Sequence, residues 1–460
     1  MFRPALPLAA RVPEAPEERE DDQHDDQDEK PSRHVVTSWP GAFPQRGRPK
    51  RGSRRHHPRV AVFRHDPELL RLLRPPRLRT LEDGHRHASY LELFFDLVFV
   101  VAIAQLAHEL VLDHSLHGFA VFGALYLPVF IAWHGFTIYA DRFDTDDVVF
   151  RVAILIGMLA ILALAVQIPD AAHGDSKGFA VAYVLMRSLM IGLYLRAYRH
   201  VPDARPLIVR YVAGYSLGVL LWIVSLGIDT PWRYVLWGVA LVWEYSLPWL
   251  ARRLFAAIPV HASHVPERFA LFTIIVLGES ILAVALGVAG RDWALSAVVI
   301  AALGFVDAAA IWWLYFGHGV EFRLERSAGS ILVFAYAHIP LLAALTAVGA
   351  GVTLAIEQSS EPGLDAGTRW ALASGVATYL VCLTVAQRTL MLGFQARTTP
   401  VRLVAIGLLV AVALGGGELE PLAFTALSTA VLVGLVLFKL WTAYRAALPR
   451  ASGAASAAEA

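Results

Sequence analysis

LELFFDLVFVVAIAQLAHELV, from Leu91 to Val111, is the first stretch of the chain that is long and apolar enough to cross a lipid bilayer. Its length matches the ~20 residues that a transmembrane helix needs. Two carboxylates, Glu92 and Asp96, lie four residues apart at its leading end. A charge inside a span costs about 2.5–3.5 kcal/mol on insertion scales, so each carboxylate needs a partner or a role.

The composition places the whole chain among membrane proteins. Its 460 residues are 56% hydrophobic and 17% charged, whereas globular proteins carry about 25% charged residues. The mean hydropathy of +0.52 predicts a polytopic, all-α membrane protein. The single cysteine, Cys382, excludes an internal disulfide and a multi-thiolate metal site.

Residues 1–88 differ sharply in composition from the rest. An acidic block from Glu14 to Lys30 is followed by a basic, proline-rich block from Arg46 to His87. Such sequence buries too little apolar area to fold, so we predict a disordered cytoplasmic tail. The basic block either is simply solvated or binds anionic lipid headgroups. A true start of translation further downstream would also explain this segment.

Beyond residue 88 the chain contains twelve apolar runs, each near the length of a membrane span. Each predicted inner loop carries more Lys and Arg than any predicted outer loop, where only Lys177, Arg233, Arg291 and Arg369 occur. This alternation follows the positive-inside rule and predicts that both termini are cytoplasmic. The predicted spans are 91–111, 118–140, 148–168, 178–198, 207–228, 232–250, 268–289, 293–317, 329–353, 370–393, 401–416 and 421–441.

Two segments of the chain resemble each other. RSLMIGLYLR at 187–196 matches RTLMLGFQAR at 388–397 with a constant offset, and the two lie six predicted spans apart. Because six is even, both halves would have the same orientation, related by an axis along the membrane normal. We therefore predict a 6+6 parallel repeat, with halves at 89–260 and 261–442 and a short cytoplasmic tail at 443–460.

Ionisable side chains inside the predicted spans are the candidates for function. Arg187 and Arg388 are expected near the midplane, and the expected partners of these arginines are Glu279 and Asp96. The set either lines a path for an ion, proton or small anion, or braces the helices against one another. The candidates are Glu92, Asp96, Arg187, Glu244, Glu279, Asp307 and Arg388.

Other kinds of site find little support. Histidines inside spans, such as His134 and His338, could relay protons but are too scattered for a metal site. No HExxH, GxSxG or phosphate-binding motif occurs, so we expect no enzyme, no catalytic residues and no cofactor. A lipid-modifying enzyme would need acid–base groups near the interface, for which Glu92 and Asp96 are the only pair. The basic residues flank spans, which argues against nucleic acid.

Gly278, Gly349 and Gly351 are expected to permit close helix approach.

Two blocks resemble one protein family. The stretch at 91–110 and ERFALFTIIVLGESIL from Glu267 to Leu282 are similar to signatures of the bacterial low temperature requirement protein A family. WWLYF at Trp312 and HIPLLAALTAVGAG at His338 also fit. The resemblance spans about residues 88–442. It implies a multi-pass protein of the bacterial cytoplasmic (inner) membrane that is linked to growth in the cold, but no reaction or substrate.

Two classes of function remain open on the sequence. The first is a transporter or channel for an ion or small solute, embedded in the lipid bilayer and possible as a homo-oligomer. FFDLVFVVAI, within 94–103, is weakly similar to the Phe-Ser-Asp-x-Val-Phe-Ala-Ile opening helix of potassium channels built from six-helix repeats, with Phe95 in place of the serine. The second class is a non-transporting membrane sensor or assembly factor that supports growth at low temperature.

Overall fold

The structure is a computed structural model of the full-length chain. It describes residues 74–78, 88–144, 146–258, 260–261, 263–290, 293–317, 327–390 and 398–458. The predicted disordered tail, 1–88, lies outside the described residues apart from 74–78 and 88.

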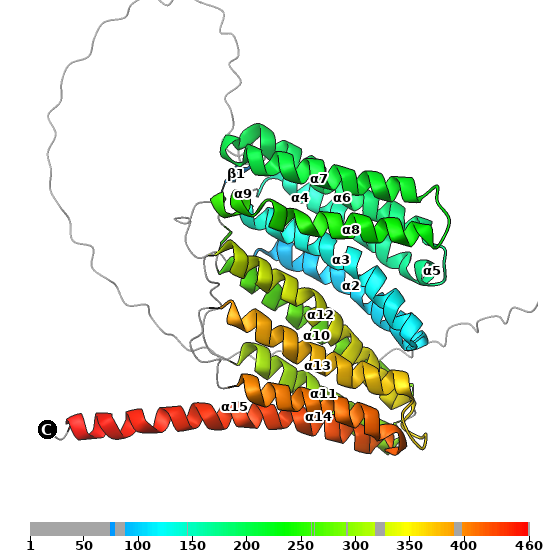
Figure 1. The fold of residues 1–460 in the computed structure, drawn as a ribbon, viewed down its shortest axis with the longest axis vertical. Coiled ribbons are helices and arrows are strands. Elements are labelled where there is room, and N and C mark those ends of the chain that lie inside the picture. Colours follow the sequence, from blue (N-terminus) through cyan, green and yellow to red (C-terminus); the bar gives the residue numbers. More distant parts are fainter. Residues whose placement is uncertain are drawn as a thin grey trace, which may run out of the picture. The chain divides into compact units, whose positions relative to one another are not determined.

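The described chain is almost entirely helical (Figure 1). A helix forms at each of the twelve predicted spans. The first six are α2 (Tyr90–Leu112), α3 (Leu116–Arg142), α4 (Val148–Val166), α6 (Lys177–His200), α7 (Arg205–Ser225) and α8 (Trp232–Leu250). The second six are α10 (His264–Ala289), α11 (Leu295–Phe316), α12 (Ala328–Glu357), α13 (Ala366–Arg388), α14 (Thr399–Gly415) and α15 (Pro421–Ala458).

Several short elements outside these helices were not predicted, and one of them, at Arg77–Leu78, contradicts the disorder predicted there. They are α5 (Ile168–Ala172), α9 (Arg252–Ala257), the 3₁₀ turns η1 (Pro202–Ala204) and η3 (Gly416–Glu418), and two strands, β1 (Arg77–Leu78) and β2 (Phe143–Asp144). The strands pair antiparallel, with Arg77 opposite Asp144. Arg196, near the end of α6, connects the segments on either side of this strand pair, because it binds Asp147 at 2.6 Å and the Arg74 carbonyl at 3.0 Å.

Eleven helices in the described part of the chain are long and apolar enough to cross a membrane. The helix missing from that set is α8, although it has the predicted bounds. It carries Arg233 and Glu244 together with several Trp and Tyr residues, which lowers its apolarity. Both charges lie on its buried face, so α8 packs its polar residues against protein rather than exposing them to lipid. The twelfth span therefore stays a prediction.

Helix starts follow ordinary capping chemistry. The Ser89 hydroxyl accepts the Glu92 N–H while the Glu92 carboxylate accepts the Ser89 N–H, which is a complete capping box at the start of α2. Ser115, Asp147 and Ser327 accept backbone N–H groups in the same way at α3, α4 and α12. These caps satisfy donors that have no intrahelical partner. They place the first turn of α2, and with it Glu92, at a fixed position.

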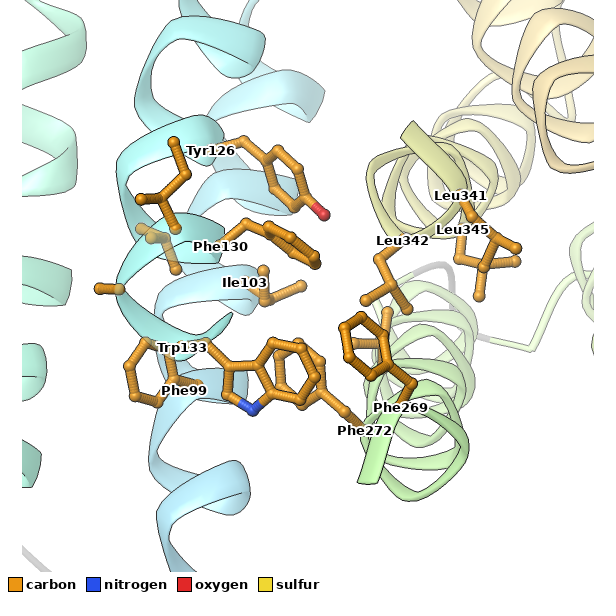
Figure 2. Packing of buried hydrophobic residues seen from close by; sticks show 14 of the residues in the cluster. Phe99, Ile103, Tyr126, Phe130, Trp133, Phe269, Phe272, Leu341, Leu342 and Leu345 are labelled. Carbon is orange, nitrogen blue, oxygen red and sulfur yellow. The ribbon is translucent and has the colours of Figure 1, made fainter. Parts of the chain in front are cut away.

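Among the described helices that are long and apolar enough to cross a membrane, α12 is the most enclosed. It packs against α10, α11 and α13, and also against α2 and α3 from the first half of the chain. Aromatic side chains fill the junction, where Phe130 and Trp133 of α3 face Phe269 and Phe272 of α10 (Figure 2). The core therefore continues from one half of the chain into the other.

Glycines set how closely some helices approach. A Cβ on Gly351 of α12 would lie 2.9 Å from the Leu372 backbone nitrogen of α13, and one on Gly349 would lie 2.6 Å from the Ser280 hydroxyl of α10. These two expectations are confirmed. The expectation for Gly278 is wrong, because a Cβ there would meet nothing within 4 Å.

The last helix is longer than predicted. It continues to Ala458, past the expected end of the span at residue 441. The added segment is rich in alanine, which has the highest helix propensity. The predicted C-terminal tail at 443–460 is thus helical through Ala458.

Asp365 at the start of α13 gives a testable pH dependence. Its carboxylate accepts the Thr368 N–H at 2.8 Å and lies 2.9 Å from His114 Nε2. Partial burial opposes ionisation, but the Thr368 N–H, His114 and Gln358 together hold the Asp365 pKa below its ordinary value. We expect Asp365→Ala to lower the free energy of unfolding by about 0.5–2 kcal/mol at pH 7.

The sign of the pH effect follows from the lowered pKa. The charged cap stabilises the folded chain above the ordinary pKa of about 3.9, and this stabilisation is lost as the pH falls through the lower folded value. Thermal unfolding in detergent should therefore show a gap between the wild type and Asp365→Ala that narrows in acid. Asp203→Ala, at an exposed site, is the control. A gap independent of pH would contradict this account.

Candidate functional site

Five ionisable side chains meet where α2, α3 and α10 pack together, and we call them the charge cluster. Glu92 and Asp96 come from α2, Asp141 from α3, and His264 and Arg268 from α10. Glu92 and Asp96 share one face of α2 because they are four residues apart, and the same spacing places His264 and Arg268 on one face of α10. The two pairs therefore face each other as two rungs.

The inner rung joins Asp96 and Arg268. Arg268 Nη2 lies 2.6 Å from Asp96 Oδ1, and the Trp133 indole N–H donates to the same oxygen at 2.8 Å. Asp96, Trp133 and Arg268 are each at most 1% exposed. Asp96 thus sits between a guanidinium and an indole, fully removed from solvent.

The outer rung is centred on His264. Its Nδ1 lies 2.9 Å from Asp141 Oδ1, and its Nε2 lies 3.8 Å from Glu92 Oε1. The other oxygen of Asp141 accepts the His261 N–H at 3.0 Å. Glu92 Oε2 accepts from Ser89 through the capping box. One imidazole is therefore enclosed by two carboxylates that the backbone holds in place.

Several polar atoms of this cluster are left unsatisfied. Three carboxylates face one guanidinium and one imidazole, and the buried Arg142 guanidinium interacts with Asp141 from outside the cluster. Arg268 Nε and Nη1 and Asp96 Oδ2 are also buried without a hydrogen-bond partner among the described residues. Desolvation of paired ions already costs several kcal/mol per ion, so the cluster is expensive for a purely structural element. Such a set can accept a proton or a water molecule.

A second buried ion pair lies between α6 and α8. Arg187 Nη2 binds Glu244 Oε2, and both side chains are at most 2% exposed. The Tyr183 hydroxyl donates to Glu244 Oε2 at 3.0 Å and accepts from Arg187 Nε at 3.0 Å. The Tyr215 ring lies 4.8 Å from the Arg187 guanidinium carbon. Both charged residues line one cavity of about 30 Å³.

The predicted partners of the buried arginines are wrong. Arg187 pairs with Glu244, and Asp96 pairs with Arg268. The physical reason is helix adjacency: α2 packs beside α10, so Asp96 meets an arginine of that helix. Periodicity fixes the face of a helix on which a charge lies, but it does not fix which helix that face meets.

Arg388 does not lie in the interior of a helix as predicted. It is the last residue of α13 and is exposed, because the helix ends there instead of continuing to residue 393. Residues 391–397, which carry the rest of the predicted repeat segment, lie outside the described residues. Arg187, by contrast, lies in the interior of α6. The two matching arginines therefore occupy different positions along their helices.

The two remaining carboxylates lie apart from both ion pairs. Glu279 is half-buried on α10 and has no hydrogen-bond or ionic partner among the described residues. Asp307 of α11 is 2% exposed and lies beside Thr429 of α15, with its Oδ1 lacking a hydrogen-bond partner in the described chain. Each is a solitary polar site within a span.

Some of the residues in these sites were not predicted. Arg268, at the first position of a predicted span, was not a predicted site residue, and neither were Trp133, Asp141 and His264. One signal was available, because His264 and Arg268 repeat the four-residue spacing of Glu92 and Asp96. Within the described ranges, no group of three or more His, Cys, Asp and Glu residues could hold a metal ion.

Comparison with known proteins decides the family. A protein-family profile described as "Bacterial low temperature requirement A protein (LtrA)" matches residues 87–437. The chain belongs to the LtrA family. An uncharacterized protein of Rhizobium meliloti is 32% identical over 305 residues, which cover 60% of this chain and 72% of that protein.

The LtrA match includes the whole charge cluster and the Arg187–Glu244 pair. The two blocks that carried the resemblance supply α2 and the main part of α10. The structure places these helices side by side, with Asp96 bound to Arg268. Both signature blocks of this LtrA protein therefore contribute to one buried site.

Proposed function

We propose that this LtrA protein is a transporter or channel that carries an ion or small solute past the charge cluster. The observation that carries the proposal is His264, buried between Asp141 and Glu92 and one helical turn from the Asp96–Arg268 pair. An imidazole held between two buried carboxylates can gain or lose a proton, and carboxylates inside a membrane commonly mark ion pathways. A group of this kind changes its charge when an ion arrives or leaves.

The path would continue along α10. Glu279 lies eleven residues beyond Arg268 on that helix, which is about 16 Å at 1.5 Å per residue. It is half-buried and has no partner among the described residues. A carboxylate at that depth supports the assignment, because intramembrane carboxylates commonly mark ion pathways.

We also propose that the protein is an internal duplication. Helix adjacency supports this: α2 packs on α3 and α4, α4 on α6, α6 on α7 and α7 on α8. In the second half, α10 packs on α11 and α12, α12 on α13, α13 on α14 and α14 on α15 in the same order. The different positions of Arg187 and Arg388 along their helices mean that helix order, rather than these arginines, supports the repeat.

The charge distribution supports an orientation with both termini in the cytoplasm of the bacterial inner membrane. Arg151, Arg196, Arg199, Arg252 and Arg253 gather at the helix ends where α2 begins. Basic loops remain on the cytoplasmic side during insertion. The charge cluster would then lie in the cytoplasmic half of the protein, with Glu279 deeper in the bilayer.

A flux assay tests the transport proposal. Purified protein is reconstituted into liposomes that contain a pH-sensitive dye, and flux is measured across a panel of ions. We expect flux for the wild type and a loss of at least tenfold for Asp96→Asn and for Glu279→Gln. Asp203→Asn, which removes an exposed carboxylate, should transport normally. Equal flux in all four proteins would refute the proposed path.

The second candidate is a non-transporting membrane sensor or assembly factor for growth at low temperature. One observation favours it: Asp96 Oδ1 is already bound by both Arg268 and Trp133, as in a brace between helices. This candidate predicts no flux for any ion in the panel, together with reduced stability of Asp96→Asn. The same preparations therefore discriminate between the two functions.

A further inference from the structure

The cavity beside the Arg187–Glu244 pair lies between α3, α6, α7, α8, α9 and α12. Its volume of about 30 Å³ has room for about two water molecules. Apart from Arg187 and Glu244, the polar residues that line it are His134, Tyr194, Tyr211, Tyr215 and Tyr245. The rest of its wall is apolar, so these buried polar groups call for an occupant with which they can form hydrogen bonds.

The polar groups around the cavity are mostly donors that the protein leaves unused. Arg187 is 2% exposed, and its Nη1 has no hydrogen-bond partner among the described residues. The Tyr245 hydroxyl is also buried without a hydrogen-bond partner among the described residues. The hydroxyls of Tyr194 and Tyr215 make no hydrogen bond to any described residue either, although both rings line the cavity.

The placement of Arg187 aims its unused nitrogen at this space. Nη1 lies beside Gly135, where a Cβ would be 3.0 Å away, and Gly135 itself lines the cavity. The nearest carboxylate oxygen without a partner, Glu244 Oε1, lies instead against Gly218 of α7, where a Cβ would be only 2.1 Å from it. The glycines therefore leave room for a donor at the cavity wall and for an acceptor on another side.

A second guanidinium lies just behind the cavity wall. The Arg142 guanidinium carbon is 4.2 Å from the Phe255 ring centre and 5.7 Å from that of Tyr211, and both rings line the cavity. Arg142 makes no ion pair with any described carboxylate within 4 Å, and its Nε and Nη2 have no hydrogen-bond partner there. Two guanidinium groups thus lie around the cavity. Its lining includes one carboxylate, Glu244, whereas Asp141, which interacts with Arg142, lies outside the lining.

We propose that this cavity binds one small monovalent anion, of the size of a halide or nitrate ion. Arg187 Nη1 supplies the charge-assisted hydrogen bond, and the hydroxyls of Tyr215 and Tyr245 complete the coordination. Aromatic ring edges, which carry partial positive charge, also favour an anion. A divalent anion would bring a second negative charge beside the buried Glu244 carboxylate. The site does not depend on whether the protein transports anything.

Anion-dependent stability of the full-length protein in detergent tests this site. The protein is exchanged into gluconate, sodium bromide or sodium nitrate is titrated in, and the Tm is followed alongside calorimetric binding. A ligand that binds only the folded state raises stability in a saturable manner. We expect saturation with bromide and nitrate, and none with sulfate.

Two single substitutions remove donors without removing rings: Tyr215→Phe and Tyr245→Phe. Hydrogen bonds to charged groups contribute about 1.5–3 kcal/mol, so each variant should bind bromide at least tenfold more weakly. Tyr126→Phe is the matched control, because that hydroxyl donates to the Ile339 carbonyl outside the cavity. Each Tm shift is referred to the anion-free value of the same variant, so that a change in basal stability does not interfere.

A third variant fills the space directly. Gly135→Ala would place a methyl group 3.0 Å from Arg187 Nη1 and should also weaken bromide binding. Absence of saturable binding by the wild type would overturn the inference, and so would equal affinities in all four variants. Binding without flux in liposomes would refute the proposed transport and leave this site standing. Flux without anion binding would refute the anion site and leave the proposed transport intact.

Discussion

Replacing Arg268 with glutamine is expected to lower the free energy of unfolding by about 3–5 kcal/mol. The reason is that Asp96, in a site with no solvent exposure, would have either to keep a charge without its ionic partner or to take up a proton. It would retain only the Trp133 indole N–H as a hydrogen-bond donor. A buried charge that loses its partner carries its full desolvation cost. The measurement is the unfolding of the purified protein in detergent, followed by circular dichroism.

The double variant Asp96→Asn, Arg268→Gln is the informative control. It removes both charges, keeps an oxygen for the Trp133 N–H and allows one amide to donate to the other. We expect it to regain most of the stability that Arg268→Gln loses. Arg199→Gln, at an exposed position, should change stability by less than about 0.5 kcal/mol. A single variant as stable as Arg199→Gln would show that the pair is not formed.

Replacing Trp133 with alanine should have an effect of similar size. The indole is fully buried and stacks on Phe272 at 4.3 Å between ring centres, with the edge of Phe269 at 4.9 Å. Figure 2 shows these rings at the contact between α3 and α10. Truncation of a buried tryptophan removes about 3–5 kcal/mol through lost contacts and a residual cavity. Chemical unfolding in detergent measures this loss.

A phenylalanine at the same position separates packing from hydrogen bonding. Trp133→Phe keeps most of the aromatic contact but removes the N–H that binds Asp96, so we expect a loss of about 1–3 kcal/mol. The alanine variant should be clearly less stable than the phenylalanine variant. Equal stabilities would mean that the hydrogen bond, and not the aromatic packing between the halves, carries the contribution of this residue.

Helix positions could be predicted well from the sequence. Eleven predicted spans are helices long and apolar enough to cross a membrane, because length and apolarity are local properties of each segment. The end of α13 at Arg388 was not predicted, because the apolar run continues beyond the last residue of the helix. An apolar run alone does not reveal where a helix stops. The unusual α8 was found as a helix, but its polar face can be interpreted only from its neighbours.

The charged candidates were predictable as a set, but their pairing was not. Glu92, Asp96, Arg187, Glu244 and Asp307 are indeed buried. Which charge meets which depends on how helices far apart in sequence pack together. The resulting pairs span 57 and 172 residues of sequence.

Arg268 shows how a position at the start of a predicted span can hide a site residue. The positive-inside rule treats arginines near the ends of spans as topology signals. Arg268 is such a residue by position, yet α10 begins four residues earlier, at His264, and turns Arg268 inward to Asp96. The early start of α10 brings both His264 and Arg268 onto the face that meets α2.

The central claim is that the charge cluster belongs to a path for an ion or small solute, and flux through the Asp96→Asn, Arg268→Gln protein in liposomes tests it most directly. This variant keeps the helices braced by neutral hydrogen bonds while it removes both charges of the inner rung. The account predicts conducting wild-type protein and a variant of similar Tm whose flux is lost. Wild-type flux that persists unchanged in this variant would contradict the account.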